Sequence, residues 1–274
     1  MKIGVGISIF WREKSDLLQT IRHVVDNLGL RNIEILCEHP FFENWGTEKA
    51  GRLKRKIRDT KETMDLEISL HTPYHDLNIA SWNLPIRRAA VKQYKECVEM
   101  ADYLDSRVVV VHPGFVSSRK FSRRDVLKIM TTNFIEILSL AEDLGIVLCL
   151  ENMASKPKAL GIYPRELLKI FEEVDSPYFK FTLDVAHANT TGVDPADFAG
   201  RMREHVHHLH LSDNQGKDNH LPIGLGTIDF KGFFKSLGGF KGTGVIEGWA
   251  PQYTDHFLSW SLEKLSDYAE KTAR

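Results

Sequence analysis

Short apolar or alternating runs recur along the chain, and each is followed by a longer stretch with helical periodicity. Runs of four to eight such residues are typical of strands, whereas apolar residues every three or four positions indicate amphipathic helices. The predicted strands cover residues 2–9, 32–38, 66–71, 107–112, 146–152, 179–184, 205–212 and 243–249. The predicted helices cover residues 14–28, 47–63, 84–104, 122–143, 164–174, 195–203, 229–237 and 255–272.

Local signals support several helix ends. Ser122 with Asp125 three residues later predicts a capping box, and Pro195 after Asp194 suits the first position of a helix. Gly29 and Gly145 each follow a helical run, where a left-handed cap is expected.

Eight strand–helix units in 274 residues predict a single (β/α)8 TIM barrel, an α/β fold that needs about 250 residues. A doubly wound open sheet fits less well, because Gly4 and Gly6 lie inside the first predicted strand and not in a loop that could hold a dinucleotide. No linker or low-complexity tract divides the chain, so we expect one domain over residues 1–274.

Composition excludes several classes of protein. With 42% hydrophobic and 27% charged residues, the chain is that of an ordinary globular protein. A net charge of −1 provides no overall positive field for nucleic acid or an anionic membrane. No apolar run is long enough to span a bilayer. Cys37, Cys97 and Cys149 form no CxxC motif, and MKIGVGISIF resembles no secretory signal, so we expect a reducing, cytoplasmic location.

Histidines and carboxylates add a specific chemistry to this picture. In a TIM barrel, functional side chains lie at the C-terminal ends of the strands. At or near their C-terminal ends, predicted strands three to eight carry, successively, His71, His112, Glu151, Asp184, His210 and Glu247. Converging imidazoles and carboxylates would compete for protons or repel one another unless a cation lay among them. The sequence therefore predicts a metal centre at this end of the barrel.

Three further candidates lie just beyond the strand ends. His187 follows Asp184 by three residues, and Asp218 and His220 lie in the loop after the seventh predicted strand. They are candidates for direct ligation, or alternatively for orienting the other ligands. A ligand set of nitrogen and oxygen without sulfur suits Zn²⁺, Mn²⁺, Fe²⁺ or Co²⁺.

The remaining histidines have plainer interpretations. His23 falls in a helical pattern. His205 and His207 lie at the start of the seventh predicted strand or on its opposite face from His210. His208 shares a face with His210 and is interpreted as a core or supporting residue.

The motifs HTPYHDLN, VVVHPG, LEN, LDVAHA, HLSDNQGKDNHLPIGLGTID and VIEGW span nearly the whole chain. With these motifs the chain resembles the xylose isomerase-like TIM-barrel superfamily, which contains sugar isomerases and epimerases as well as endonuclease IV of AP endonuclease family 2. The resemblance to the epimerase branch implies one divalent metal ion, held by Glu151, Asp184, His210 and Glu247. The resemblance to endonuclease IV implies a three-metal cluster that also uses His71, His112, His187, Asp218 and His220.

Departures from the endonuclease IV pattern favour the epimerase branch. Three residues separate Tyr74 from Asn78 where endonuclease IV has two, and Asp-Thr-Cys-His is replaced by the motif that ends in His187. The loop from His210 to Asp218 is also shorter. All three differences fall in loops that shape the substrate site.

The favoured function is therefore a metal-dependent isomerase or epimerase of a small sugar, sugar phosphate or cyclitol, with one to three ions, Zn²⁺ or Mn²⁺ by preference. Glu151 and Glu247 would move the proton as a catalytic pair. Tyr74, His187 and Trp249 would bind substrate, and His75 is a further candidate for that contact. Aromatic residues near the first strand ends would exclude water or simply pack: Phe10, Trp11, Phe41 and Trp45.

The alternative is an endonuclease IV-like phosphodiesterase acting on abasic DNA, the only function here with a nucleic-acid partner. This alternative is supported by a basic cluster after the fourth predicted strand, which could contact phosphates and consists of Arg119, Lys120, Arg123 and Arg124. The other interpretation of this cluster is the solvent-exposed start of a helix. A barrel that only binds sugar or metal is a third hypothesis. Two facing glutamates, Glu151 and Glu247, speak against it, because simple binding does not need both.

Overall fold

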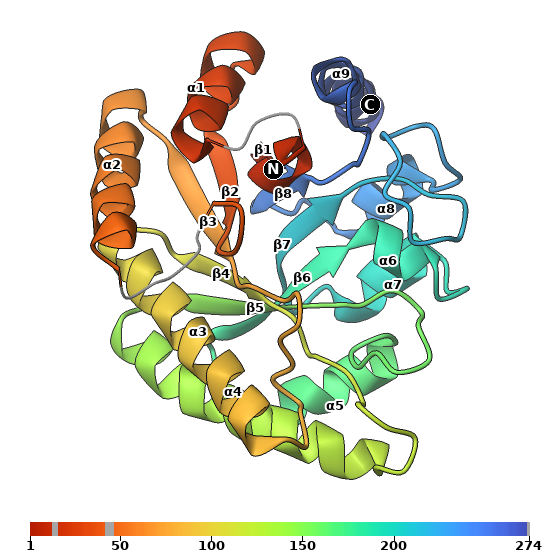
Figure 1. Ribbon diagram of the computed structural model, residues 1–274. Coiled ribbons are helices and arrows are strands. Elements are labelled where there is room, and N and C mark those ends of the chain that lie inside the picture. Colours follow the sequence, from red (N-terminus) through yellow and green to blue (C-terminus); the bar gives the residue numbers. More distant parts are fainter. Residues whose placement is uncertain (13–15, 42–46, 273–274) are drawn as a thin grey trace.

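Parallel strands close into a barrel at the centre of the computed structural model, which describes residues 1–12, 16–41 and 47–272 (Figure 1). Within these residues the strands are β1 (Lys2–Gly6), β2 (Asn32–Leu36), β3 (Glu67–His71), β4 (Val108–Val111), β5 (Val147–Glu151), β6 (Phe179–Asp184), β7 (Val206–Leu211) and β8 (Thr243–Ile246). Each strand pairs in parallel with the next, and β8 pairs with β1. The predicted TIM barrel is confirmed.

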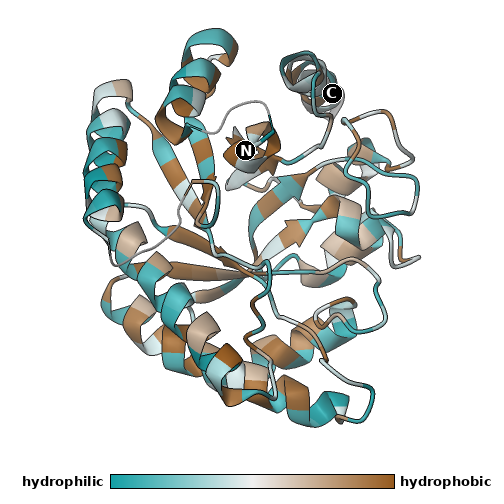
Figure 2. Cartoon of the chain, viewed as in Figure 1, coloured by the Kyte–Doolittle hydropathy of each residue, from teal (hydrophilic) through white to brown (hydrophobic). Residues whose placement is uncertain are grey.

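Helices surround the barrel and alternate with its strands. They are α1 (Leu17–Leu28), α2 (Glu48–Met64), α3 (Leu84–Tyr103), α4 (Arg123–Asp143), α5 (Pro164–Val174), α6 (Val185–Asn189), α7 (Pro195–Met202), α8 (Phe230–Ser236) and α9 (Thr254–Thr272), with a 3₁₀ turn η1 (Ile7–Phe10). The helices carry both hydrophobic and hydrophilic stretches, while the strands are largely hydrophobic (Figure 2). Nowhere in the described chain is a helix long and apolar enough to cross a membrane.

Aromatic side chains fill the layer between the barrel and its helices. Phe134 of α4 and Phe171 of α5 both pack on Phe179 of β6, with ring centroids 5.4 and 5.2 Å apart. Burial of this apolar surface is the main stabilising term of the fold.

The structure differs from the predicted elements at three places. The first predicted strand ends at Gly6, and residues 7–10 form η1. Helix α6 directly follows Asp184, whose side chain caps it by accepting from the His187 backbone N–H. A helix of five residues is too short to produce a periodic pattern. The first helix begins at Leu17, and residues 14 and 15 of the expected span lie outside the described residues.

Most of the capping signals are confirmed. Asp194 accepts hydrogen bonds at the start of α7, where Pro195 is the first residue. Gly29 and Gly145 both have a φ of 67° after their helices. The capping box at Ser122 is wrong, because this residue is the N-cap of α4 but its side chain makes no capping hydrogen bond. The residue is exposed, so water can satisfy its hydroxyl group.

Gly114, in the turn after β4, lies close to Asn78, in the turn after β3. These two turns carry His112 and Tyr74. Gly114 has a φ of 79°, and a Cβ atom there would lie 2.4 Å from Asn78 Oδ1. This oxygen accepts from the backbone N–H groups of Ala80 and Phe115, both at 3.1 Å. Only glycine fits both the backbone conformation and the contact.

We therefore expect Gly114→Ala to destabilise the protein by more than the ~1–3 kcal/mol that a strained backbone conformation alone costs. The matched control is Gly192→Ala, because Gly192 has a φ of 77° with no atom within 4 Å of the added Cβ. Denaturant unfolding of both variants measures the difference. Equal losses of unfolding free energy would contradict the role of the Asn78 contact.

Candidate metal centre

The residues predicted at the strand ends meet at the C-terminal mouth of the barrel. Among the described residues, three overlapping groups each bring ligand atoms within 4.8 Å of one another at this mouth. The groups are Glu151, Asp184, His210 and Glu247; His71, His112 and Glu151; and Asp184, His187 and His220. Glu151 and Asp184 each belong to two groups, so these form one continuous cluster.

The first group is centred on His210 of β7. Its Nδ1 atom lies 3.0 Å from Glu247 Oε2 and 3.4 Å from Glu151 Oε1. His210 Nδ1 and Asp184 Oδ2 are buried and have no hydrogen-bond partner among the residues that the structure describes. Buried polar atoms normally have one, and these belong to the nitrogen and carboxylate donors that divalent transition metals bind. The group therefore fits a divalent metal ion.

The second group gathers two imidazoles around Glu151. His71 Nε2 lies 3.2 Å and His112 Nε2 3.0 Å from Glu151 Oε2. The other ring nitrogen of His71 lies 2.8 Å from the carbonyl oxygen of Thr72, so Nδ1 carries the proton that it donates. This leaves the Nε2 lone pair of neutral His71 facing the cluster.

The third group joins helix α6 to the loop after β7. His187 Nδ1 lies 2.8 Å from the carbonyl oxygen of Asn152 and donates to it, so its Nε2 faces the cavity side. Asp218 Oδ1 lies 3.5 Å from His187 Nε2 and 3.1 Å from His220 Nε2. Asn152 also bonds in both directions with the backbone of Asp184, at 2.9 Å each, which ties the end of β5 to that of β6.

Electrostatic coupling within the cluster shifts several pKa values. Burial raises the pKa of Glu151, but the charges of His210 and His112 and the hydrogen bonds of His112 and His187 outweigh it and hold this pKa well below its usual range. Burial acts to lower the pKa of His210, whereas the surrounding carboxylates raise it well above its usual value. His210 thus carries a proton that balances the carboxylates, and a metal ion bound here would displace it.

A cavity of about 490 Å³ opens above the cluster. Besides the cluster itself, its lining includes Trp11, Tyr74, His75, Met153, Lys156 and Trp249. Tyr74 stacks on His112 with ring centroids 4.5 Å apart, and Trp11 meets Trp249 edge to face at 6.3 Å. The predicted substrate-binding residues Tyr74, His187 and Trp249 therefore all face one cavity.

Other aromatic and basic candidates lie away from this cavity. Phe10 and Phe41 are buried in the core, which agrees with packing, and Trp45 lies outside the described residues. In the basic cluster, Arg123 makes two contacts of 2.7 Å with Glu166 of α5. The described lining of the cavity includes none of Arg119, Lys120, Arg123 and Arg124.

Two residues of the site were missed from the sequence. Lys156 Nζ lies 2.5 Å from Asp218 Oδ2, so a basic group does accompany the cluster. Glu34 of β2 is buried in the barrel beside His210. The available signal for Glu34 was a single carboxylate inside an otherwise apolar strand, and for Lys156 its position five residues after Glu151.

Comparison with known proteins supports the expected superfamily. A family model for the xylose isomerase-like TIM barrel matches residues 23–270. An uncharacterized protein of Methanocaldococcus jannaschii is 36% identical over 256 residues, which cover 90% of this chain and 82% of the relative. The crystal structure of a D-tagatose 3-epimerase-like protein has 32% identity and a TM-score of 0.88, covering 100% of this chain and 98% of that chain. A probable endonuclease 4 of Mesomycoplasma hyopneumoniae is 28% identical over 186 residues, or 62% of this chain and 64% of the relative.

Proposed function

Because this chain belongs to the xylose isomerase-like TIM barrel family, we propose that it is a metal-dependent isomerase or epimerase of a small sugar, sugar phosphate or cyclitol. The observation that carries the proposal is the meeting of Glu151 and Glu247 with Asp184 and His210 beneath a cavity of about 490 Å³. The 32% identity to a D-tagatose 3-epimerase-like protein over the whole chain supports the same chemistry.

Glu151, Asp184, His210 and Glu247 would hold the metal ion. When bound, a divalent ion polarises the carbonyl group of a substrate and stabilises the negative charge that develops when the adjacent carbon loses a proton. The donor set contains no sulfur, which suits Zn²⁺ or Mn²⁺.

Glu151 is the last residue of β5 and Glu247 directly follows β8, and the two are the proposed acid–base pair. In an epimerisation, one carboxylate removes the proton from one face of the substrate carbon, and the other returns a proton to the opposite face. Tyr74 and His187 line the cavity and would hold substrate hydroxyl groups. Trp11 and Trp249 would cover the reacting carbon and exclude water.

Exchange of substrate C–H protons with D₂O tests this function. We expect the Mn²⁺- or Zn²⁺-loaded protein to incorporate deuterium next to the carbonyl of at least one member of a panel of ketoses and their phosphates, as followed by proton NMR. The Glu151→Gln/Glu247→Gln double variant, purified identically, lacks both proposed proton carriers and controls for contaminating isomerases. If no ketose exchanges faster with the wild type than with this variant, the proposal fails.

A second candidate is phosphodiester hydrolysis of the endonuclease IV type. The specific observation in its favour is that the second and third groups, around His71 and His187, add ligand sets beside the first. Similarity to a probable endonuclease 4 points the same way. A fluorescent abasic-site duplex, incubated at low salt with Zn²⁺ or Mn²⁺, should be cut if this function holds. An intact and unbound duplex would exclude it.

A further inference from the structure

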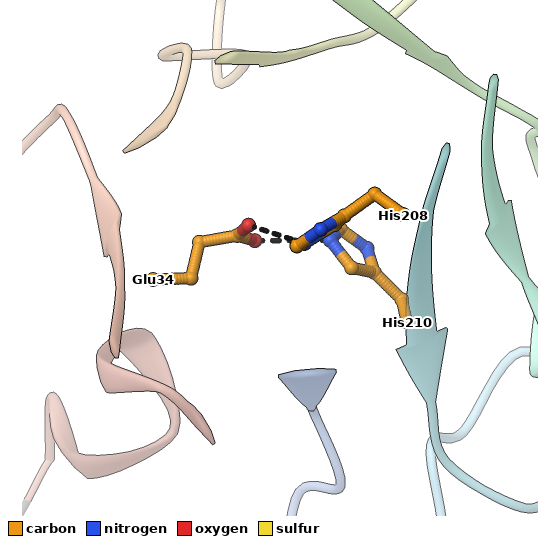
Figure 3. Close-up of side chains that lie close together, drawn as sticks. All are labelled: Glu34, His208 and His210. Carbon is orange, nitrogen blue, oxygen red and sulfur yellow. Dashed lines mark hydrogen bonds and ion pairs between the residues drawn. The ribbon is translucent and has the colours of Figure 1, made fainter. Parts of the chain in front are cut away.

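Another buried polar cluster lies inside the barrel, next to the proposed metal centre. It consists of Glu34 from β2 and of His208 and His210 from β7 (Figure 3). In the closed barrel, β1 and β8 lie between these two strands. The exposed fractions are 2% for Glu34, 1% for His208 and 0% for His210. A carboxylate with so little contact with water requires partners within the protein.

Both oxygens of Glu34 face such partners. Oε1 lies 2.9 Å from His210 Nε2, a close ion-pair contact that is not a linear hydrogen bond. Oε2 lies 2.9 Å from His208 Nε2 and accepts a hydrogen bond from the Ser69 hydroxyl at 2.8 Å. Ser69 is also the register partner of Glu34 between β2 and β3. The Glu34 carboxylate is thus held by His208 of β7 and Ser69 of β3, and it also contacts His210.

His210 connects this cluster to the metal centre, because its two ring nitrogens face opposite ways. Nε2 faces Glu34, whereas Nδ1 faces Glu247 and Glu151. A neutral imidazole carries its proton on only one nitrogen, and a metal ion binds the other. A carboxylate beside Nε2 stabilises the proton there, which leaves the Nδ1 lone pair free.

We propose that Glu34, held by His208 and Ser69, is a positioning residue that fixes the ring of His210 and keeps its proton on Nε2, so that Nδ1 presents its lone pair to the metal ion. The inference rests on the proposed function, since it needs a metal ion between Glu151, Asp184, His210 and Glu247. Carboxylates that orient a ligating histidine in this way change metal affinity by about 10–100-fold when they are replaced.

Co²⁺ titration of the metal-free protein tests the role of Glu34 without measuring catalysis. Glu34→Gln keeps the size of the side chain but removes the charge beside Nε2. We expect the Co²⁺ dissociation constant to rise by about 10–100-fold and the d–d absorption bands to shift, since the His210 ligand is altered.

Thr182→Val is the matched control. Thr182 is a buried residue of β6 and pairs in register with His208, and its hydroxyl has no hydrogen-bond partner in the described chain. This variant should bind Co²⁺ with the wild-type constant and spectrum. Equal weakening in Thr182→Val and Glu34→Gln would show only a general disturbance of the barrel interior, and would overturn the proposal.

Four further outcomes decide between these interpretations. A folded Glu34→Gln protein with the wild-type Co²⁺ constant and spectrum would reduce Glu34 to a core residue and overturn the inference. The inference would also be overturned if Glu34→Gln bound one Co²⁺ ion fewer per chain while the other ions bound with unchanged affinity, because Glu34 would then be a metal ligand itself. If Glu34→Gln does not fold, Glu34→Asp keeps the charge but shortens the reach, and a wild-type constant there overturns the inference equally. A wild-type protein that binds no Co²⁺ would instead refute the proposed function.

Discussion

Glu247→Gln is expected to lower the rate of C–H exchange from the substrate face that Glu247 serves by about 10²–10⁴-fold, the usual contribution of a general acid or base. The amide has the size of the carboxylate but accepts no proton at neutral pH. Glu247 lies just after β8 with its side chain partly exposed to the cavity, so the variant should fold. Proton NMR in D₂O at saturating metal measures the rate, and Co²⁺ titration checks that the variant still binds metal.

The paired mechanism makes this prediction sharper. Glu151→Gln and Glu247→Gln should each stop interconversion of the two epimers, but each should retain exchange from the substrate face that the other glutamate serves. Glu172→Gln is the control, because Glu172 is exposed on α5. Wild-type interconversion in either cavity variant would contradict a catalytic pair.

Removing the metal should cause the second large effect. A ligand present at 1,000 times its dissociation constant stabilises a protein by about 4 kcal/mol if it binds only the folded state. For a chain of this size that corresponds to a shift in melting temperature on the order of 10 °C. We expect EDTA to lower the melting temperature by this amount, and to abolish C–H exchange, with both restored by Mn²⁺ or Zn²⁺.

Asp184→Asn is the control for metal stabilisation. Asp184 is buried, and its Oδ2 atom lies 3.4 Å from His187 Nδ1 but has no hydrogen-bond partner among the described residues. The variant therefore loses one ligand and the charge that faces His187, but no hydrogen bond of Oδ2. Its melting temperature should respond little to EDTA. Elemental analysis of the wild type then counts the ions. One ion per chain supports the epimerase, three support phosphodiester hydrolysis, and a melting temperature independent of metal would contradict the proposed centre.

The sequence predicted the mouth of the barrel well, because that prediction needed only local patterns and one property of the fold. The C-terminal end of each strand is marked where a run of apolar or alternating apolar and polar residues gives way to polar residues, as at His71 and Glu151. Once parallel strands close into a barrel, all their C-terminal ends lie together. The convergence of His112 and Asp184 therefore follows from their positions along the chain, without any knowledge of individual contacts.

Contacts across the barrel could not be predicted in this way. Glu34 reaches His208 and His210 from a strand that does not pair with theirs, and Lys156 meets Asp218 between two loops. Such contacts depend on the stagger of the strands and on side-chain rotamers. No pattern within a segment of sequence records either of these.

By itself, the sequence determined the eight strand–helix units, the TIM barrel and the residues at its mouth, because hydrophobic periodicity and capping are properties of neighbouring residues. Only the tertiary structure decided which ring nitrogen of His210 faces the cluster, and that Glu34 lies against the other one. It also separated the buried Phe10 from Trp11 at the cavity. These differences arise from close packing in three dimensions, where residues far apart in the chain determine each other's orientation.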